Sequence, residues 1–443
     1  MTKQIKLSDS LKDFNYRLFG TLILISLLPT IYTTVRIYFL GNLPGDWGFN
    51  IASQLAWVNI FYEVVQEALI LPLFYLISKV ISNREQLSNR IQTGLVSSFL
   101  VFLVMTVLIL IFVRPLLAFM GQKSEIITAT SAYIRLEAIA IQISVLFRFI
   151  SIVLIILNKN SRLLILLAIQ MVLTIVSDTF LVSSLSISFQ IGVNGIALGN
   201  IIVNLVLVGI GLTMLKQEGL QVFSYAKANF SWQKEWIKIG GLSGIESFDR
   251  NAAFTLMIIR MINMIQEQGT FWVANNFIWG WLLLPILALG ELIKRNTAES
   301  AESIDKKLPA YWALTGLVCI LWLVTIPFWN LFIGKVMNVA DYTAVVSVAI
   351  ISLVFYIIFA FNNVVDSIFY GLGRTDLMLY QSLIVNTVYY GGMFIAYRVG
   401  LFIPSLNGIA IMFGTGMAID SVITFIMFIV LRRINRLVLS ETV

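Results

Sequence analysis

Apolar runs of 18 or more residues recur along the whole 443-residue chain and constrain its fold more than any other feature. Each run is long enough to cross a hydrocarbon layer about 30 Å thick as a helix. Backbone groups in lipid must be hydrogen-bonded within their own segment, so such runs have to be helical. Hydrophobic residues make up 59% and charged residues 12% of the chain, against about 45–50% and about 25% in soluble domains. The chain is therefore predicted to be an all-α polytopic membrane protein.

The apolar runs predict twelve transmembrane helices. Lys and Arg concentrate in the N-terminal tail, in the even-numbered connections and after the last run, so the positive-inside rule places both termini in the cytoplasm. An even number of spans agrees with this, and the expected location is the cell (plasma) membrane. The predicted spans are 17–40, 52–78, 92–113, 131–157, 163–185, 192–215, 241–264, 271–293, 309–333, 345–370, 376–397 and 407–431.

The second half of the chain repeats features of the first half at a fixed offset. Asn194-Gly195-Ile196-Ala197 recurs as Asn407-Gly408-Ile409-Ala410, and Pro72 recurs as Pro285. Both separations, 407 − 194 and 285 − 72, equal 213 residues. A membrane chain that repeats itself in this way is expected to form two similar lobes, and a cleft between such lobes is where transporters hold their substrate.

The repeat predicts the domain organisation. The N-terminal six-helix lobe is expected at 1–215, a cytoplasmic linker at 216–240 and the C-terminal six-helix lobe at 241–443. Six is an even number, so both lobes begin and end on the same side and are related by a pseudo-two-fold axis along the membrane normal. No Gly-rich ATP-binding loop occurs in the sequence, so transport has to draw on an ion gradient or on the gradient of the substrate.

Composition excludes several other classes of function. The chain has no His and a single Cys319, in an apolar run, which removes the commonest metal ligand and any thiolate site. No nucleophile–base pair is evident, so the chain is not expected to be an enzyme or to have catalytic residues. No cofactor is expected beyond a coupling sodium ion or proton. Its +7 charge lies in short connections, which argues against nucleic-acid binding. The expected partners are the lipid bilayer and a small amphiphilic substrate, with the protein as a monomer.

Ionisable side chains inside spans cost about 2.5–3.5 kcal/mol each on insertion scales, so they are candidates for function. Glu63 and Glu67 lie one helical turn apart and can share a proton, although pairing of Glu63 with an Arg of a neighbouring helix is the alternative, and both readings stay open. Asp366 follows two amides, Asn362 and Asn363, by about one turn. This arrangement suits a hard cation or a protonated carboxyl group, and a structural role stays open.

A second group of charges lies at the entry of span 7. Glu246 and Arg250 are one turn apart and can form an intrahelical ion pair, which leaves one further carboxylate, Asp249, for a cation or a proton. The only metal considered is a sodium ion at Glu246 and Asp366. The ion-coupling candidates are Glu246, Asp249, Asp366, Asp178, Glu63 and Glu67.

Aromatic and amide side chains supply candidates for the substrate cleft. Trp279 and Tyr389 can pack against aromatic, cationic compounds through their ring faces. In a chain with 13% aromatic residues, contact with lipid or core is the alternative for each of them. The substrate-cleft candidates are Arg36, Asn275, Asn276, Trp279, Asn363 and Tyr389.

Three short motifs occur in order along the predicted spans: Ser177-Asp178-Thr179-Phe180 with the run from Gly192 to Asn200, the run from Gly240 to Glu246, and Asp366 with the run from Gly371 to Thr375. Together they resemble motifs of the multidrug and toxic compound extrusion (MATE) family, in the polysaccharide/drug exporter (MOP) superfamily. The first resembles an acidic helix before a Gly-X-X-Gly-Ala-Ala run, the second a Gly-X-Pro-X-X-X-Glu pattern, and the third an acidic helix and its glycine loop. The resemblance implies a V-shaped antiporter with six plus six helices that expels organic cations in exchange for sodium ions or protons. It also implies that Asp178 belongs to a first-lobe ion site, and Glu246 and Asp366 to a second-lobe site.

One position departs from the family pattern. Many members carry an Asp in span 1, five residues before a glycine, and this chain has Arg36 five residues before Gly41. Arg stays protonated in proteins, so it cannot exchange a proton. Beside Asp178 it would act as a built-in cation, and ion coupling would then depend on Glu246, Asp249 and Asp366. The alternative is that Arg36 faces the headgroups at the end of its span.

Two functions remain after this reasoning. The first is a secondary active multidrug or organic-compound efflux antiporter, driven by a sodium or proton gradient, with alternating access between two lobes. The second is a flippase or exporter of a lipid-linked saccharide or another amphiphilic or anionic substrate, and the intramembrane arginines keep it open. A membrane scaffold is disfavoured, because a scaffold has no need of repeated lobes and buried charges.

Overall fold

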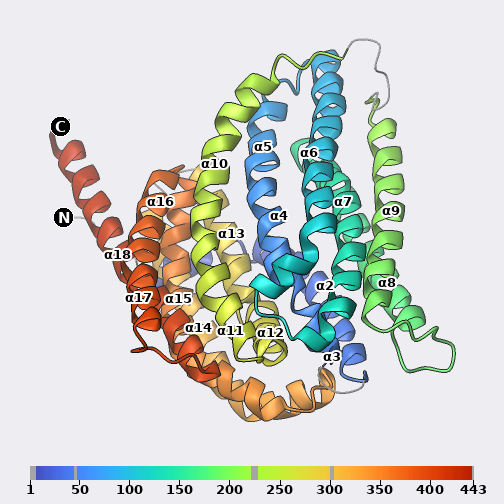
Figure 1. Ribbon diagram of the computed structural model, residues 1–443. Coiled ribbons are helices and arrows are strands. Elements are labelled where there is room, and N and C mark those ends of the chain that lie inside the picture. The colour runs from blue at the N-terminus through green and yellow to red at the C-terminus, as the bar shows by residue number, and fades with distance from the viewer. Residues whose placement is uncertain (1–5, 44–46, 221–227, 300–303, 442–443) are drawn as a thin grey trace. The chain divides into compact units, whose positions relative to one another are not determined.

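The computed structural model describes residues 6–43, 47–220, 228–299 and 304–441 (Figure 1). Inside the helices, the side chains of a few residues lie outside this description, and Glu246 and Arg250 are among them. The described chain is helical along most of its length. Its α-helices are α1 Leu7–Lys12, α2 Tyr16–Leu40, α3 Trp47–Ala52, α4 Leu55–Leu69, α5 Leu71–Ser78, α6 Arg84–Phe119, α7 Ile127–Ile156, α8 Asn160–Leu181, α9 Val193–Gln217, α10 Gln233–Ala253, α11 Arg260–Met264, α12 Gln268–Phe277, α13 Leu284–Glu299, α14 Ile304–Leu331, α15 Tyr342–Gly371, α16 Thr375–Ile384, α17 Gly391–Arg398 and α18 Leu406–Glu441.

Each of the twelve predicted spans coincides with a helix or with consecutive helices of the structure. Within the described residues, eight helices are long and apolar enough to cross a membrane. A ninth candidate is the pair Gln268–Leu282 and Leu284–Thr297, which is bent by 53°. The remaining predicted spans, 52–78, 241–264 and 376–397, correspond to helices with an internal interruption.

The interruptions have two local causes. The helix over 52–78 breaks into α4 and α5 at Ile70, next to Pro72, which has no N–H to donate. Elsewhere a wider π-helical turn replaces part of an α-helix, a feature that is frequent at functional sites. These π-helices are η3 Phe254–Ile259, η4 Ile278–Leu282, η6 Phe332–Val336 and η7 Val385–Tyr390.

Side-chain caps begin two of the longest helices. The Asn83 side chain accepts a hydrogen bond from the Gln86 backbone N–H (3.1 Å) at the start of α6. Asp341 accepts one from the Ala344 N–H (3.2 Å) at the start of α15. Each cap satisfies a backbone donor that has no partner within the first turn of a helix.

Contacts divide the chain into two compact units. One unit contains residues 31–269 and 337–339, and the other contains the remainder. Helix α2 contributes to both units and changes from one to the other after Thr30, next to Pro29. The predicted lobe boundaries stay a prediction, because units defined by contacts and lobes defined by a sequence repeat are different divisions of the chain.

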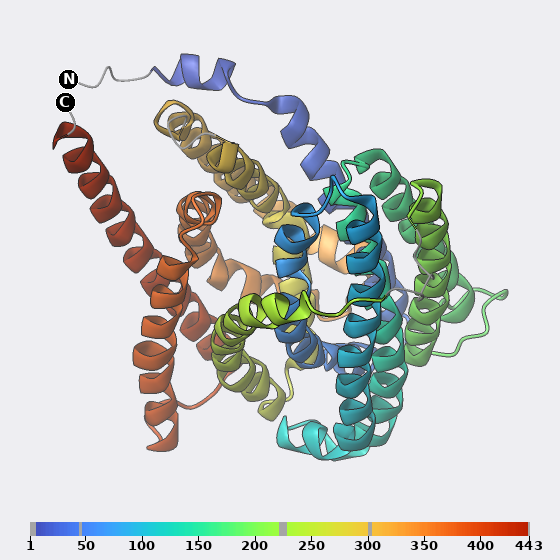
Figure 2. The same ribbon diagram turned by 90° about the horizontal axis from the view of Figure 1, so that it is seen from above.

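In the unit of residues 31–269, helices α6, α7 and α9 lie side by side, as both views show (Figures 1 and 2). Their core is built on fully buried side chains such as Ile91, Phe149 and Leu207. The indole rings of Trp232 and Trp236 stack at 4.9 Å between centroids and join this core. Helix α10 thus begins at Gln233, inside the segment 216–240 that the sequence suggested as a linker.

In the other unit, α15 packs against α13 and α18. Leu292, Val365 and Phe369 are fully buried there, and Phe14 of the N-terminal segment joins the same cluster. The Ser10 hydroxyl accepts a hydrogen bond from the Ala310 backbone N–H (3.1 Å), which ties α1 to α14. The apolar core of this unit therefore includes the N-terminal end of the chain.

Candidate functional site

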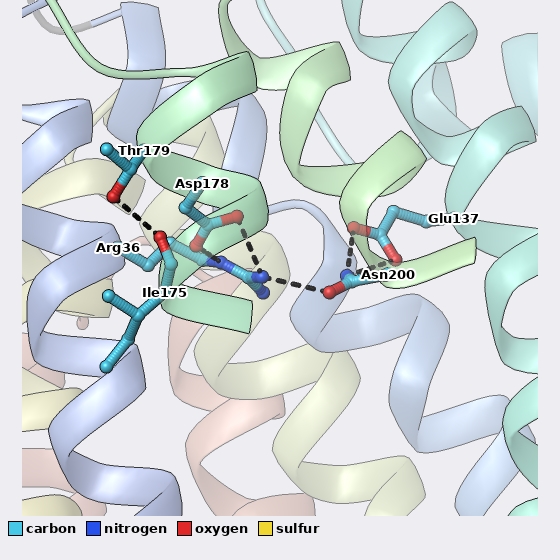
Figure 3. Close-up of polar contacts among 6 residues, drawn as sticks. All are labelled: Arg36, Glu137, Ile175, Asp178, Thr179 and Asn200. Carbon is cyan, nitrogen blue, oxygen red and sulfur yellow. Dashed lines mark hydrogen bonds and ion pairs between the residues drawn. The ribbon is translucent and has the colours of Figure 1, made fainter. Parts of the chain in front are cut away.

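Arg36 of α2 and Asp178 of α8 form an ion pair (Figure 3). The guanidinium donates from Nε to Oδ2 (2.8 Å) and from NH2 to Oδ1 (3.2 Å). The Asp178 side chain is 1% exposed and the Arg36 side chain 15% exposed. Two parallel N–H···O bonds make this a bidentate pair, which is the strong geometry for Arg and carboxylate. Arg36 thus lies beside Asp178, and both its depth relative to the headgroups and its role in transport stay predictions.

Asn200 of α9 connects Arg36 to a second carboxylate. Its Oδ1 accepts from Arg36 NH2 (2.9 Å), and its Nδ2 donates to both oxygens of Glu137 of α7 (2.9 and 3.1 Å) (Figure 3). Glu137 is 2% exposed, and the Tyr133 hydroxyl is a further hydrogen-bonding neighbour of it. We call Arg36, Glu137, Asp178 and Asn200 the first-half cluster.

Glycines in the motif before Asn200 bring α9 close to α8. A Cβ at Gly195 would lie 2.8 Å from the Leu181 carbonyl oxygen, and a Cβ at Gly199 would lie 3.1 Å from the Ser177 Cβ. Small residues permit this approach between membrane helices. The close approach places Asn200 within reach of the pair that Asp178 forms with Arg36.

The first-half cluster holds one permanent cation and two carboxylates. Arg36 supplies its positive charge in every protonation state of the neighbouring acids. Buried charges are stable only when they are paired and hydrogen-bonded. The described contacts give each carboxylate nitrogen donors of its own: Arg36 for Asp178 and Asn200 for Glu137. The cluster thus holds its own cation and needs no bound ion to pair Asp178.

A second polar cluster lies in the other unit, on α15, α16 and α18. Asn362 Nδ2 donates to Asp366 Oδ2 (2.8 Å), and Gln381 Nε2 donates to Asp420 Oδ2 (2.6 Å). The Thr424 hydroxyl donates to Gln381 Oε1, and Asp366 lies within electrostatic range of Asp420. We call Asn362, Asp366, Gln381, Asp420 and Thr424 the second-half cluster.

Oxygen atoms without a hydrogen-bond partner distinguish this region. Among the described residues, Asn362 Oδ1 and Asp366 Oδ1 are buried and accept no hydrogen bond, and the hydroxyl of the adjacent Ser367 is also unpartnered. A buried polar atom without a partner costs about 1–3 kcal/mol. Both clusters contain two carboxylates, but this one contains no arginine or lysine among its own members, and Lys294 lies within electrostatic range of Asp366. Its free oxygens are ligands of the type that hard cations take.

The other acidic candidates have different surroundings. Glu63 of α4 is exposed and Glu67 is half-buried, and both have interaction partners. Arg148 of α7 lies within electrostatic range of both carboxylates and donates to Gln66 Oε1. These surroundings agree with the alternative reading that Glu63 pairs with an Arg of a neighbouring helix. Whether Glu63 and Glu67 share a proton stays a prediction.

The candidates of span 7 lie on α10. The side chains of Glu246 and Arg250 fall outside the described residues, so their predicted ion pair is untested. Asp249 is half-buried and has an interaction partner. The sodium site predicted at Glu246 and Asp366 therefore stays a prediction.

The substrate-cleft candidates other than Arg36 mostly use their polar atoms within one unit. Asn276 Nδ2 donates to the Trp272 carbonyl (2.8 Å), and Asn363 Nδ2 donates to the Ile286 carbonyl (3.1 Å). Two aromatic candidates are similarly engaged: Trp279 Nε1 donates to the Tyr356 hydroxyl (3.2 Å) and Tyr389 donates to the Met412 carbonyl (2.8 Å). Asn275 is half-buried. Their part in substrate binding stays a prediction.

Comparison with known proteins agrees with the twelve-helix architecture. The sequence model of the MatE family matches residues 81–180. An inward-facing multidrug resistance MATE family transporter of the MOP superfamily superposes with a TM-score of 0.73 at 16% identity, over 93% of this chain and 96% of that one. The chain has the MATE fold. Its resemblance to the MATE family and the all-α, two-lobe fold class are confirmed, and the solved proteins that share this fold are membrane transporters.

Two further solved MATE-fold proteins are similar over nearly the whole chain. A variant of the Vibrio cholerae MATE transporter VcmN has a TM-score of 0.66 at 16% identity, covering 96% of this chain and 97% of that one. A MOP superfamily transporter from Pyrococcus furiosus, described as having a binding pocket of reverse polarity that suggests a different function, has a TM-score of 0.69 at 17% identity with the same coverage. No curated protein matches the chain significantly in sequence.

Proposed function

We propose that the protein is a secondary active efflux transporter that exchanges a small amphiphilic compound for a sodium ion or a proton by alternating access. The observation that carries this proposal is the contrast between the two clusters. The first-half cluster contains a permanent cation at Arg36, whereas the second-half cluster contains two carboxylates and free oxygens. One proton or one sodium ion would offset one of the two carboxylate charges of the second-half cluster, and its departure would leave two like charges close together.

The proposed orientation follows from the distribution of basic residues. We place both termini in the cytoplasm, because Lys and Arg concentrate on that side of the predicted topology. We further propose that the protein acts as a monomer in the plasma membrane. Export then means movement of the compound from the cytoplasm or the inner leaflet to the outside.

The test uses purified protein in liposomes loaded with a fluorescent cationic dye. Imposing a sodium gradient or a proton gradient in separate experiments should drive dye movement in one of the two cases. Asp366→Asn should abolish the response to that gradient, because it removes a carboxylate of the second-half cluster. Asp376→Asn is the matched control, since Asp376 is an exposed carboxylate paired with Arg374 at the start of α16. Gradient-driven transport that survives in Asp366→Asn at the wild-type rate would contradict the proposal.

The second candidate function is export of an anionic or lipid-linked substrate. The buried Arg36 favours it, and the Pyrococcus furiosus transporter of similar fold is described as having a pocket of reverse polarity. In this chain, however, Asp178 and Glu137 offset the charge of Arg36. Movement of an anionic lipid analogue, with no dye movement under either gradient, would favour this second function.

A further inference from the structure

A cavity of about 330 Å³ lies between the bend of α12–α13 and helix α14, within one unit of the chain. Its volume is within the range of about 300–1,000 Å³ that small-molecule sites occupy. None of the residues assigned to the first-half or second-half cluster lines it. It is therefore a separate feature of the protein.

Aromatic side chains dominate the lining of this cavity. Six of its eleven lining residues are aromatic, whereas aromatic residues make up 13% of the chain. Several rings already meet in edge-to-face contacts: Phe277 with Trp329 at 5.3 Å and Trp281 with Phe332 at 5.2 Å between centroids. The aromatic lining residues are Phe277, Trp281, Trp322, Phe328, Trp329 and Phe332.

The local backbone explains why these rings face an open space. The π-helical turn η4 and Pro285 bend the chain, and the Leu282 carbonyl accepts a hydrogen bond from the Trp322 indole N–H (2.9 Å). Trp329 Nε1 donates to the Thr325 hydroxyl (3.2 Å), which itself donates to the Trp322 carbonyl (2.9 Å). The indole N–H groups of Trp322 and Trp329 and the Thr325 hydroxyl thus all donate hydrogen bonds within the protein. These three side chains therefore present apolar surface to the cavity.

The rim of the cavity continues into the apolar exterior of α14. Leu321 and Phe328 at the rim are 51% and 63% exposed, and the neighbouring Ile320 and Val324 are 58% and 62% exposed. No Asp, Glu, Lys or Arg is among the lining residues. A lipophilic molecule dissolved in the bilayer therefore reaches the rim along an apolar helix surface.

We propose that this cavity binds an uncharged, planar, lipophilic aromatic molecule. Aromatic pairs contribute about 0.5–1.5 kcal/mol beyond area burial, and six rings offer several such contacts. A cation would gain about 2 kcal/mol from one desolvated ring face. It would also lose several kcal/mol on leaving water with no carboxylate in the lining. The absence of a counter-charge decides in favour of a neutral ligand.

The test measures binding without any gradient, so its failure and the failure of the proposed ion coupling are distinguishable. Pyrene is titrated into the full-length protein in lipid nanodiscs, and tryptophan-to-pyrene energy transfer is recorded against empty nanodiscs. Saturable transfer is expected for pyrene. A pyrene carrying a trimethylammonium group and a pyrene carboxylate should each bind about tenfold more weakly or worse, a difference of about 1.4 kcal/mol. Tighter binding of the cationic derivative, or no saturable pyrene binding, would overturn the proposal.

Two tryptophan substitutions localise the site with equal numbers of tryptophans. Leu321→Trp adds bulk at the rim and should weaken pyrene binding about tenfold, that is by about 1.4 kcal/mol. Leu323→Trp is the matched control, because Leu323 is 50% exposed, against 51% for Leu321, and does not line the cavity. It should bind pyrene like the wild type. Val318→Phe, a second filling variant inside the cavity, should also weaken binding. Wild-type binding by both filling variants, or equal losses in Leu321→Trp and Leu323→Trp, would show that pyrene binds elsewhere.

Discussion

The side-chain amide of Asn200 connects Arg36 to Glu137, because its oxygen accepts from the guanidinium while its nitrogen donates to both carboxylate oxygens. These bonds join α2, α7 and α9 at one point. The hydrogen bonds of this amide link the Arg36–Asp178 pair to Glu137, so Asn200 is a sensitive position for substitution.

Replacing Asn200 with Leu should destabilise the protein strongly. The change removes the donors to a buried carboxylate, and hydrogen bonds to charged groups contribute about 1.5–3 kcal/mol. Asn204→Leu is the control on the same helix face, since Asn204 is buried, where Asn200 is half-buried, and donates to the neutral Ala140 carbonyl (3.4 Å). The melting temperature in detergent should fall further for Asn200→Leu than for Asn204→Leu. Equal decreases in melting temperature for the two variants would show that the charge of Glu137 does not make its hydrogen bond to Asn200 more stabilising than that of Asn204 to a neutral carbonyl.

Removing Arg36 should be worse than removing the whole ion pair. Arg36→Leu leaves Asp178 buried and uncompensated, at a cost of about 3–5 kcal/mol. The double variant Arg36→Leu/Asp178→Leu removes both charges and should recover part of the lost melting temperature. Arg36→Lys should lie between the wild type and Arg36→Leu, because a lysine cannot form the bidentate pair. A double variant less stable than Arg36→Leu would contradict the ion-pair interpretation.

Two adjacent glycines of α10 should respond in opposite ways to alanine. A Cβ at Gly240 would run into the Ala68 carbonyl oxygen of α4, whereas nothing lies within 4 Å of a Cβ at Gly241. Gly240→Ala should therefore reduce folded yield or melting temperature severely. Gly241→Ala should be neutral or stabilising by up to about 1 kcal/mol, because alanine favours the helix over glycine. Comparing size-exclusion profiles and melting temperatures of the two variants tests the packing of α10 on α4.

Glu218, at the C-terminal cap of α9, should make stability depend on acid pH. The Lys159 ammonium (Nζ–Oε2 2.9 Å) and the Arg162 guanidinium (NH2–Oε1 3.0 Å) hold the pKa of Glu218 below its ordinary value. A carboxyl group whose pKa is lower in the folded state stabilises above its unfolded pKa of about 4.3. That stabilisation is lost as the pH falls through the folded value.

The measurement is the difference in melting temperature between the wild type and Glu218→Gln as a function of pH. The wild type should be more stable near neutral pH, and the difference should shrink from about pH 5 downward as Glu218 becomes protonated. Glu291→Gln is a control, because Glu291 is exposed and forms its ion pair with Lys294 within α13, away from α9. A difference that stays constant down to pH 3 would contradict the role of the two cations.

The sequence predicted the helical fold well, because the length and polarity of apolar runs follow directly from the thickness of the bilayer. All twelve predicted spans correspond to helices, although α6 extends over Arg84–Phe119 where the prediction was 92–113. The π-helical turns were not predictable, since one extra residue in a turn leaves an apolar run unchanged in composition. Trp236 was predicted in a polar linker and is 2% exposed, because its ring packs against Trp232 and not toward solvent.

The candidate site was predicted less completely. Arg36 was placed beside Asp178 from the position of a glycine and from family resemblance, and the two side chains are in contact. Glu137 lies within the predicted span 131–157, but its partner was not predicted. Its bond to Asn200 crosses 63 residues of sequence and depends on how α7 packs against α9. One feature of the sequence could have indicated this bond. Asn200 is a polar residue directly after Gly199 in an otherwise apolar run, and a glycine that allows two helices to approach closely places the next polar side chain within reach of a neighbouring helix.

Arg36 also has a consequence for how the protein responds to voltage. Its positive charge is part of the polypeptide, so it stays with the protein when a cargo molecule and a coupling ion cross the membrane. A potential of 100 mV acts on each elementary charge that crosses with about 2.3 kcal/mol. The current per transport cycle is therefore set by the charge of the cargo and by the ion taken up elsewhere, and the fixed guanidinium adds nothing to the net charge transferred.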